Sequence, residues 1–176
     1  MLDFENLVKT RQSCRDFNDK PLEKDVVEQI VSLATLAPSA CNSQPWKMIC
    51  VTDESKLDAV AKSLQDRGMN KFTDKAKAFI VLVEKQATLK ERVSVKFNRN
   101  HFVKYDIGQL CAYITLTAKY KGVESCIIGW INQDALRNAV NYGEDEESNI
   151  VIALGYSDCE IRDKIRKDKD QVITIL

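Results

Sequence analysis

The chain predicts a three-layer arrangement of helices and β-strands within one domain. Three observations predict it: apolar residues repeat at helical spacing in several segments, short apolar runs typical of strands alternate with those segments, and no linker or internal repeat divides the 176 residues. The length also suits a single domain over residues 1–176. The order of the elements does not fix the direction of the strands.

Two helices are expected in the first forty residues. One lies within residues 2–10. The other follows Pro21 and ends at Pro38, because the residue before a proline is displaced from helical backbone geometry. The apolar positions of this second helix fall on one broad face at helical spacing. They are Val26, Val27, Ile30, Val31, Ala34 and Leu36.

Three further helices are expected along the rest of the chain. Asp53 or Ser55 caps the first of them and Gly68 closes it. Its apolar positions repeat at i, i+3, i+4 and i+7: Leu57, Val60, Ala61 and Leu64. A long helix over residues 105–120 is closed by Gly122, and its small residues allow the close approach of another helix: Gly108, Cys111, Ala112, Thr115 and Ala118. A short helix spans residues 133–141.

Apolar segments of strand type lie between these helices. They cover residues 48–52, 78–83, 125–130 and 149–154. The run AFIVLV at 78–83 has no polar position, which is typical of a strand that is buried on both faces. The final segment QVITIL at 171–176 favours β-structure but stands alone, and the charged residues 85–104 give no clear assignment.

Charge and composition exclude several classes of protein. Lys and Arg total 26 and so do Asp and Glu, so the formal net charge is zero. A broad nucleic-acid-binding surface would show as a basic excess, and we expect no nucleic-acid partner. No apolar run approaches the ~20 residues that span a bilayer, and the N-terminus lacks the pattern of a signal peptide. We therefore expect a cytoplasmic protein with no membrane partner.

The cysteines do not form a metal-binding motif. Six are present, no two have CxxC spacing, and the chain has a single histidine, His101. No metal site is therefore expected. In a cytoplasmic protein we expect all six thiols to be reduced and to pack as small apolar residues. A redox role for Cys14 or Cys41 is the alternative.

A phosphate-binding pattern lies near the N-terminus. Arg11, Ser13 and Arg15 alternate in RQSCR, so in an extended backbone the three side chains point the same way. Two guanidinium groups and a hydroxyl could then hold one phosphate. The alternative is an exposed basic turn after the first helix. A second basic run, RDKIRKDK at 162–169, places Lys164 and Arg166 on one face, and here a solvated charge run is the alternative.

These segments together resemble the nitroreductase family of FMN-dependent oxidoreductases. The resemblance rests first on RQSCRDF at 11–17, PLE at 21–23 and APSACNSQPW at 37–46. It continues in KFTDKAKAFIVLV at 71–83, in YDIGQLCAYITLTAKYKGVESCIIGW at 105–130, in IALGY at 152–156 and in KIRK at 164–167. Nearly the whole chain is covered, and the pair formed by R-x-S-x-R and APSxxNxQPW is specific.

The resemblance implies an α+β fold with a mixed central β-sheet flanked by helices. It also implies an intertwined homodimer with FMN at the subunit interface. The helix at 105–120 looks like the central dimer helix of the family. The tail, about residues 168–176, looks like the extension that family members lay on the partner subunit, where it would pair an exposed strand edge.

The resemblance also implies which residues bind FMN. The phosphate and ribityl chain would be held by both ends of the chain: Arg11, Gln12, Ser13, Cys14, Arg15, Lys164 and Arg166. The partner subunit would bring one loop to the flavin: Pro38, Ser39, Ala40, Asn42 and Gln44. Backbone and apolar contacts would come from Ile127, Ile128 and Gly129, and Lys71 would lie near the N1–O2 edge of the ring.

The cofactor carries the chemistry in such enzymes, so no catalytic side chain is expected. A cation or N–H donor stabilises the negative charge that reduction places near flavin N1 and O2. The resemblance implies a ping-pong cycle in which NADH or NADPH delivers a hydride to N5 and a small nitroaromatic or quinone acceptor is then reduced. Flavin reduction or reductive dehalogenation by the same fold is one alternative, and a non-enzymatic FMN-binding protein is another.

The chain departs from the family pattern between its second strand and its long helix. Many members have extra helices there that cover the substrate pocket, whereas only residues 86–104 fill the interval here. A more open pocket is therefore expected. Phe97, Phe102 and Trp130 are candidates to line it, with ordinary core packing as the alternative. His101 could donate a proton to a substrate, or it could be an ordinary surface histidine.

Overall fold

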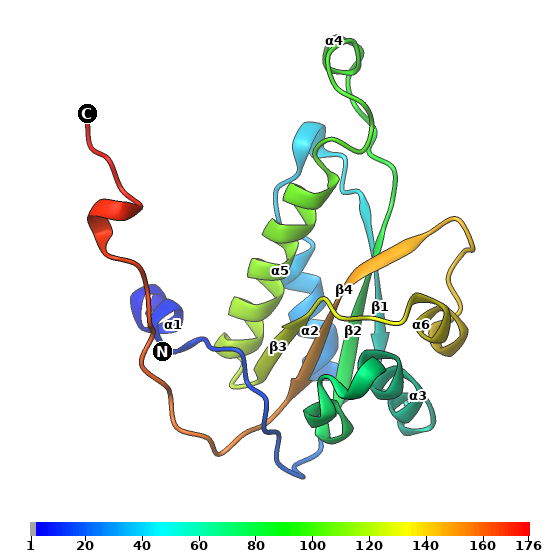
Figure 1. The fold of residues 1–176 in the computed structure, drawn as a ribbon, viewed down its shortest axis with the longest axis vertical. Coiled ribbons are helices and arrows are strands. Elements are labelled where there is room, and N and C mark those ends of the chain that lie inside the picture. The colour runs from blue at the N-terminus through cyan, green and yellow to red at the C-terminus, as the bar shows by residue number, and fades with distance from the viewer. Residues whose placement is uncertain (1–2) are drawn as a thin grey trace.

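The computed structural model describes residues 3–176 (Figure 1). Its α-helices are α1 (Phe4–Thr10), α2 (Lys24–Ala34), α3 (Glu54–Leu64), α4 (Glu91–Ser94), α5 (Val103–Tyr120) and α6 (Gln133–Val140). Its strands are β1 (Trp46–Val51), β2 (Ala78–Glu84), β3 (Glu124–Ile128) and β4 (Glu147–Gly155). The sequence predicts all of these elements except α4, which lies in the unassigned interval 85–104, and the bounds of the others differ from the prediction by a few residues. The expected residue 2 of the first helix lies outside the described part.

The strands form one sheet in the order β1-β2-β4-β3, and each neighbouring pair is antiparallel. In the register, Met48 lies opposite Leu82, and Ile80 lies opposite Ile152. The parallel part of the predicted mixed sheet is an isolated bridge between Ser13 and Ser125 at the outer edge of β3. The short segment after α1 is thereby attached to the sheet edge.

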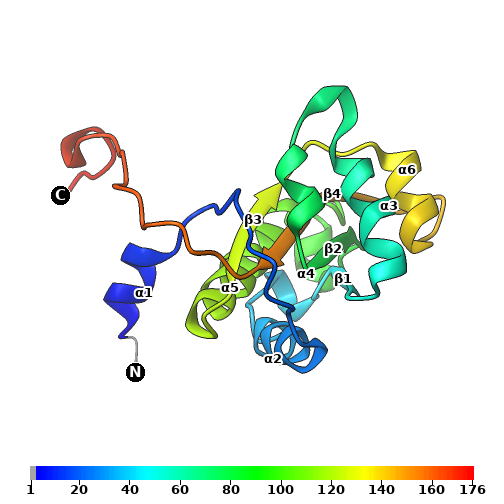
Figure 2. The same ribbon diagram turned by 90° about the horizontal axis from the view of Figure 1, so that it is seen from below.

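Helices cover both faces of the sheet, which gives the three layers that the sequence predicts (Figures 1 and 2). β2 shows the reason, because its side chains alternate between two cores. Ala78, Ile80 and Leu82 pack with residues of α2 and α5. Its other apolar side chains pack with residues of α3 and α6, and they are Phe79, Val81 and Val83. This confirms that the run at 78–83 is a strand buried on both faces.

Some local predictions fail where a helix ends earlier than expected. Helix α2 ends at Ala34, and the turn that follows leaves the side chain of Leu36 71% exposed, so its predicted place on the core face is wrong. Gly68 is not the cap of α3, because that helix ends at Leu64 and Gly68 belongs to a separate turn. Gly122 does close α5: its φ is +75°, and its N–H donates to the carbonyl oxygen of Lys119.

The six cysteines are free thiols, as predicted, but they do not all pack in the core. Cys14, Cys111 and Cys126 are buried, whereas Cys50 and Cys159 are exposed, so the prediction of core packing is wrong for those two. Burial raises the pKa of the Cys111 thiol to about 11, which keeps it protonated at neutral pH. Within residues 3–176 no cluster of potential metal ligands occurs. Across the same range, no helix combines the length and the apolar character needed to cross a bilayer.

The molecule exposes more surface than a compact monomer of its mass. Its accessible area is 11126 Å², whereas a compact monomer of 20.0 kDa would expose roughly 8,700 Å². Figures 1 and 2 show the cause, since α1 and the C-terminal segment extend away from the layered body. The tail forms a short turn at Lys169–Gln171 and no strand within this single chain.

Candidate functional site

The two basic segments of the sequence meet in one pocket of about 400 Å³. It is lined by residues 11–13, by Arg15 and by residues 162–166. Figures 1 and 2 show how this happens, because the C-terminal segment turns back after β4 and runs beside α1 and the segment that follows it. The structure thus brings together Arg11, Gln12, Ser13 and Arg15 with Lys164 and Arg166, as the sequence predicts.

The N-terminal side of this basic pocket is fixed to the sheet. The N–H of Cys14 donates to the carbonyl oxygen of Ser125 at 2.9 Å. Three residues further on, Phe17 is buried against Gly155, and the N–H of Asn18 donates to the carbonyl oxygen of Tyr156 at 2.8 Å. Cys14 itself is buried, and its N–H is already used, so neither its thiol nor its N–H faces the pocket.

Replacing Gly155 with alanine is expected to lower the free energy of unfolding by about 1–3 kcal/mol. The new Cβ would lie 2.8 Å from Cδ1 of Phe17, whose side chain is fully packed and cannot move aside. Urea unfolding measures the effect. Gly129→Ala is the matched control, because its Cβ would meet the carbonyl oxygen of Asn149 at an ordinary 3.7 Å. Equal losses in the two variants would contradict the proposed clash.

The C-terminal side of the pocket is held by side chains that bond to the backbone. Arg162 donates from Nη2 to the carbonyl oxygen of Ser13 at 2.6 Å and from Nε to Oε1 of Gln12 at 3.2 Å. Gln12 in turn donates to the carbonyl oxygen of Glu160 at 3.1 Å, and Lys164 donates to the carbonyl oxygen of Arg11. Arg162 was not predicted as a site residue. Its position within a charged run gave no sign that it would reach back to Gln12.

The electrostatics of the pocket favour an anion. Of the lining residues, five carry positive charge, and Asp163 carries the one negative charge. The cationic residues are Arg11, Arg15, Arg162, Lys164 and Arg166. Partial burial, and then the neighbouring charges of Arg166 and Arg11, lower the pKa of Lys164. The Nε atom of Arg11 is buried and has no hydrogen-bond partner within residues 3–176. A phosphate would supply both the missing acceptor and the missing negative charge.

The other predicted residues of this side follow the edge of β3. The side chain of Ile127 is 36% exposed, whereas Ile128 is buried among residues of α3 and α6 and can offer only its backbone. Gly129 follows at the exposed end of the strand, roughly 13 Å along the chain from Ser125 at the usual strand rise. There Trp130 donates from Nε1 to the carbonyl oxygen of Asp66, and Lys71 lies exposed a few residues after Asp66.

The loop over residues 38–44 lies near the N-terminal end of α5, away from α1 and the C-terminal segment that runs beside it (Figure 1). Its backbone is unusual, because Cys41, Asn42 and Gln44 have φ values between 47° and 55°. It is fixed by hydrogen bonds from the N–H of Gln44 to Oγ of Ser39 and from the N–H of Ala40 to Oδ1 of the buried Asp106. One chain therefore does not bring this loop to the basic pocket.

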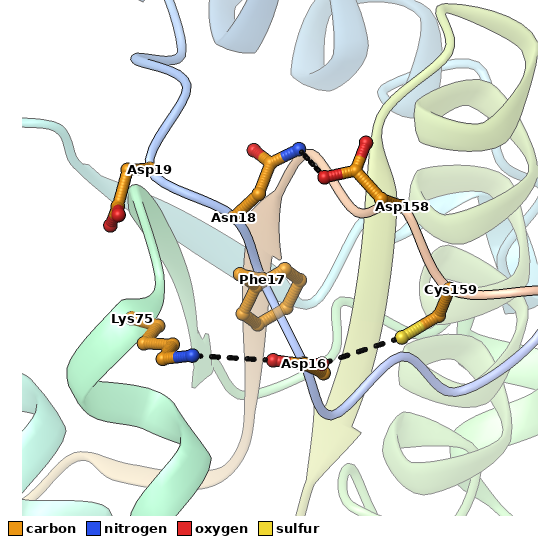
Figure 3. Close-up of a pocket in the computed structure, with 7 residues that line it drawn as sticks. All are labelled: Asp16, Phe17, Asn18, Asp19, Lys75, Asp158 and Cys159. Atoms are coloured by element: carbon orange, nitrogen blue, oxygen red, sulfur yellow. Dashed lines mark hydrogen bonds and ion pairs between the residues drawn. The ribbon is translucent and has the colours of Figure 1, made fainter.

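A second pocket joins the beginning of the tail to the body (Figure 3). Asn18 donates to the carboxylate of Asp158 at 2.9 Å, and the thiol of Cys159 donates to that of Asp16 at 3.5 Å. Lys75 forms an ion pair with the same Asp16 carboxylate at 3.4 Å. These contacts fix where the tail leaves β4 and so direct it toward the basic pocket. The acidic lining makes this second pocket unsuitable for an anion.

Comparison with known proteins agrees with this fold. The model of the Nitroreductase family matches residues 8–156, which include residues 11–15, the loop at 38–44 and the whole sheet. The chain belongs to the nitroreductase family. The matched region of this nitroreductase family member ends before Arg162, so the C-terminal half of its basic pocket lies outside the match.

Individual relatives are distant in sequence but cover most of this family member. A curated protein of Archaeoglobus fulgidus, provisionally named as an NADH dehydrogenase/NAD(P)H nitroreductase, is 27% identical over 85% of this chain and 83% of its own length. A nitroreductase family protein of Streptococcus pneumoniae has the same fold, with a TM-score of 0.85 at 21% identity, and covers 99% of this chain and 100% of its own. An FMN-dependent nitroreductase of Clostridium difficile has a TM-score of 0.74 at 25% identity, with 96% of each chain covered.

Proposed function

We propose that this protein is an FMN-dependent oxidoreductase that uses NAD(P)H to reduce a small acceptor such as a nitroaromatic or a quinone. One observation supports the proposal above the others: the basic pocket combines five cations with a buried guanidinium nitrogen that has no acceptor among the described residues 3–176. The relative from Archaeoglobus fulgidus is named for NAD(P)H, and the one from Clostridium difficile for FMN. A phosphate-bearing cofactor accounts for both the charge and the unused donor.

The residues of the pocket divide into those that would hold the FMN phosphate and those that shape the pocket. Guanidinium and hydroxyl donors come from Arg11, Arg15, Arg166 and Ser13, and one nitrogen of Arg166, Nη1, already donates to the carbonyl oxygen of Ile165. Arg162 and Gln12 are bonded to each other and to the backbone, so they fix the pocket wall. Lys164 donates to the backbone of Arg11 and adds its charge. Ile127 and Gly129 are exposed along the edge of β3, where the ring would lie.

FMN, when bound, supplies the hydride transfer chemistry at N5, so the side chains need only bind, orient and stabilise charge. Lys71 is exposed, five residues after Asp66, whose carbonyl oxygen accepts from Trp130 just beyond β3, and it would stabilise negative charge on the reduced ring. A ping-pong cycle follows if NAD(P)H and the acceptor use the same exposed ring face in turn. Parallel lines in double-reciprocal plots are the expected steady-state result.

The proposed site is completed by a second copy of the chain. The loop at 38–44 is too far along the molecule to reach the basic pocket of its own chain, so Pro38, Ser39, Ala40, Asn42 and Gln44 would come from the partner. Helix α5 exposes small and aromatic side chains on which the two copies would meet: Gly108, Ala112 and Tyr113. Each chain would form a single domain, and its tail, about residues 168–176, would extend from that domain onto the surface of the partner.

The decisive experiment is anaerobic reduction of the purified protein. We expect one flavin per chain in the absorbance spectrum, and we expect NADH or NADPH to bleach it. The nucleotide that bleaches faster identifies the donor. Protein that is colourless and cannot be reconstituted with FMN would overturn the proposal. Bound flavin that neither nucleotide reduces would instead indicate an FMN-binding protein without this activity.

A further inference from the structure

Residues 88–105, called the basic arm below, include α4 and the first residues of α5, and the part with α4 projects beyond the N-terminal end of α5 (Figure 1). Both ends of the basic arm are attached to the loop at 38–44. At its start the N–H of Thr88 donates to Oγ of Ser43 at 2.6 Å. Just after its end the carboxylate of Asp106 accepts from the N–H of Ala40 at 3.0 Å. Any ligand that this loop contacts therefore lies within reach of the basic arm.

The basic arm presents a cluster of aromatic rings. His101 lies at its centre, with its ring centroid 4.5 Å from that of Phe97 and 4.6 Å from that of Phe102. Tyr105 adds a fourth ring, 6.4 Å from His101, and its side chain is 67% exposed. These rings pack on one another rather than in the core of the domain, so their outer surfaces remain available to a flat aromatic ligand.

The charge of the basic arm is strongly positive although the whole chain is neutral. Its sequence contains a single carboxylate, Glu91, against five exposed cations: Lys90, Arg92, Lys96, Arg99 and Lys104. None of these cations forms an ion pair with any residue in the described range 3–176. The nearby Lys85, by contrast, is paired with Glu146. Lys96 lies over the ring of Phe97 at 5.5 Å, so unpaired charge and aromatic surface coincide.

We propose that the basic arm selects an aromatic anion as the electron acceptor, that is, an aromatic ring bearing a carboxylate or sulfonate group. This inference rests on the proposed function, because it takes the loop at 38–44 to lie at the flavin. The ring of the ligand stacks on the aromatic cluster, and Lys96 and Arg99 attract its anionic group. The same unpaired positive charge accelerates the encounter with anions in a way that salt weakens.

The test uses two probes of nearly equal shape, 4-nitrobenzenesulfonate and its neutral sulfonamide. Binding to the oxidised full-length protein is measured by calorimetry, and reoxidation of the NADH-reduced protein is followed by stopped flow. In the variant K96Q/R99Q we expect the sulfonate to bind roughly fivefold to tenfold more weakly, with the sulfonamide unchanged. In Phe97→Leu we expect both probes to bind more weakly. The control K47Q/K56Q removes two exposed lysines from other elements and should change neither.

The outcomes separate this inference from the proposed function. An equal change for both probes in K96Q/R99Q, or no change for either, would overturn the selection of an anion. If K96Q/R99Q instead slows reduction of the flavin by NADPH but not by NADH, the selection of an anionic acceptor is also overturned, because the cations would then recognise the electron donor. If the protein binds the sulfonate as expected but NAD(P)H reduces no flavin, the proposed function fails while the ligand class of the basic arm stands.

Discussion

Replacement of Arg11 by alanine is expected to raise the dissociation constant of FMN by roughly one to two orders of magnitude. The variant removes a guanidinium group whose buried Nε has no acceptor within residues 3–176 and which the proposed phosphate would complete. A hydrogen bond to a charged group is worth about 1.5–3 kcal/mol, which sets this range. Fluorescence titration of the apoprotein with FMN measures it.

Riboflavin, which lacks the phosphate, is the matched ligand for this measurement. Its affinity should be the same for the Arg11→Ala variant and the unmodified protein, because the lost interaction is with the phosphate alone. Lys56→Ala removes an exposed cation from α3 and should leave FMN binding unchanged. An Arg11→Ala variant that binds riboflavin and FMN with equally reduced affinity would place Arg11 elsewhere than at the phosphate.

Deletion of residues 171–176 is expected to weaken the proposed homodimer at least about a hundredfold, because it removes four exposed aliphatic side chains of the kind whose burial contributes about 1.5–3 kcal/mol each. They are Val172, Ile173, Ile175 and Leu176. The deletion leaves Arg162, Lys164 and Arg166 in place, so the basic pocket is preserved. Sedimentation velocity over a range of protein concentrations measures the change.

The control for this deletion is the double variant K169A/D170A, which alters the exposed polar turn before the removed segment. It should leave the association unchanged. If the deleted chain dimerises as tightly as the full chain, the tail does not lie on the partner. If the full chain itself is monomeric at micromolar concentrations, the composite flavin site is wrong.

The sequence predicts the helices and strands well where the pattern of buried residues is compatible with only one type of secondary structure. The run at 78–83 is a strand because every side chain in it is covered by a helix layer on one face or the other. Leu36 shows the opposite case. Its spacing fits the face of α2, but the helix has already ended at Ala34, so the helical rotation no longer applies and the side chain is exposed. Periodicity gives the face of a helix and not its last residue.

The site is predicted only as far as short motifs reach. The motif RQSCR predicts the N-terminal half of the basic pocket, because the alternation of side chains along an extended segment depends only on neighbouring residues. Arg162 could not be found in this way, since its contacts with Gln12 join positions 150 residues apart. The left-handed backbone at Cys41 and Gln44 also could not be predicted from the sequence. Cysteine and glutamine rarely adopt a positive φ, whereas glycine and asparagine do so more readily.

The joining of residues 11–15 with residues 162–166 has a consequence for biosynthesis. Arg162 is added to the growing chain 150 positions after Gln12, which at 5–20 residues per second corresponds to roughly 8–30 seconds of translation. Until then Arg11 and Arg15 lack the residues at 162–166 that form the other side of the basic pocket. Loading of the proposed FMN would therefore be a late event that follows the emergence of residues 162–166 from the ribosome. A cofactor bound there would contact both residues 11–15 and residues 162–166. Because it binds only when the two segments are together, it would stabilise their association by mass action.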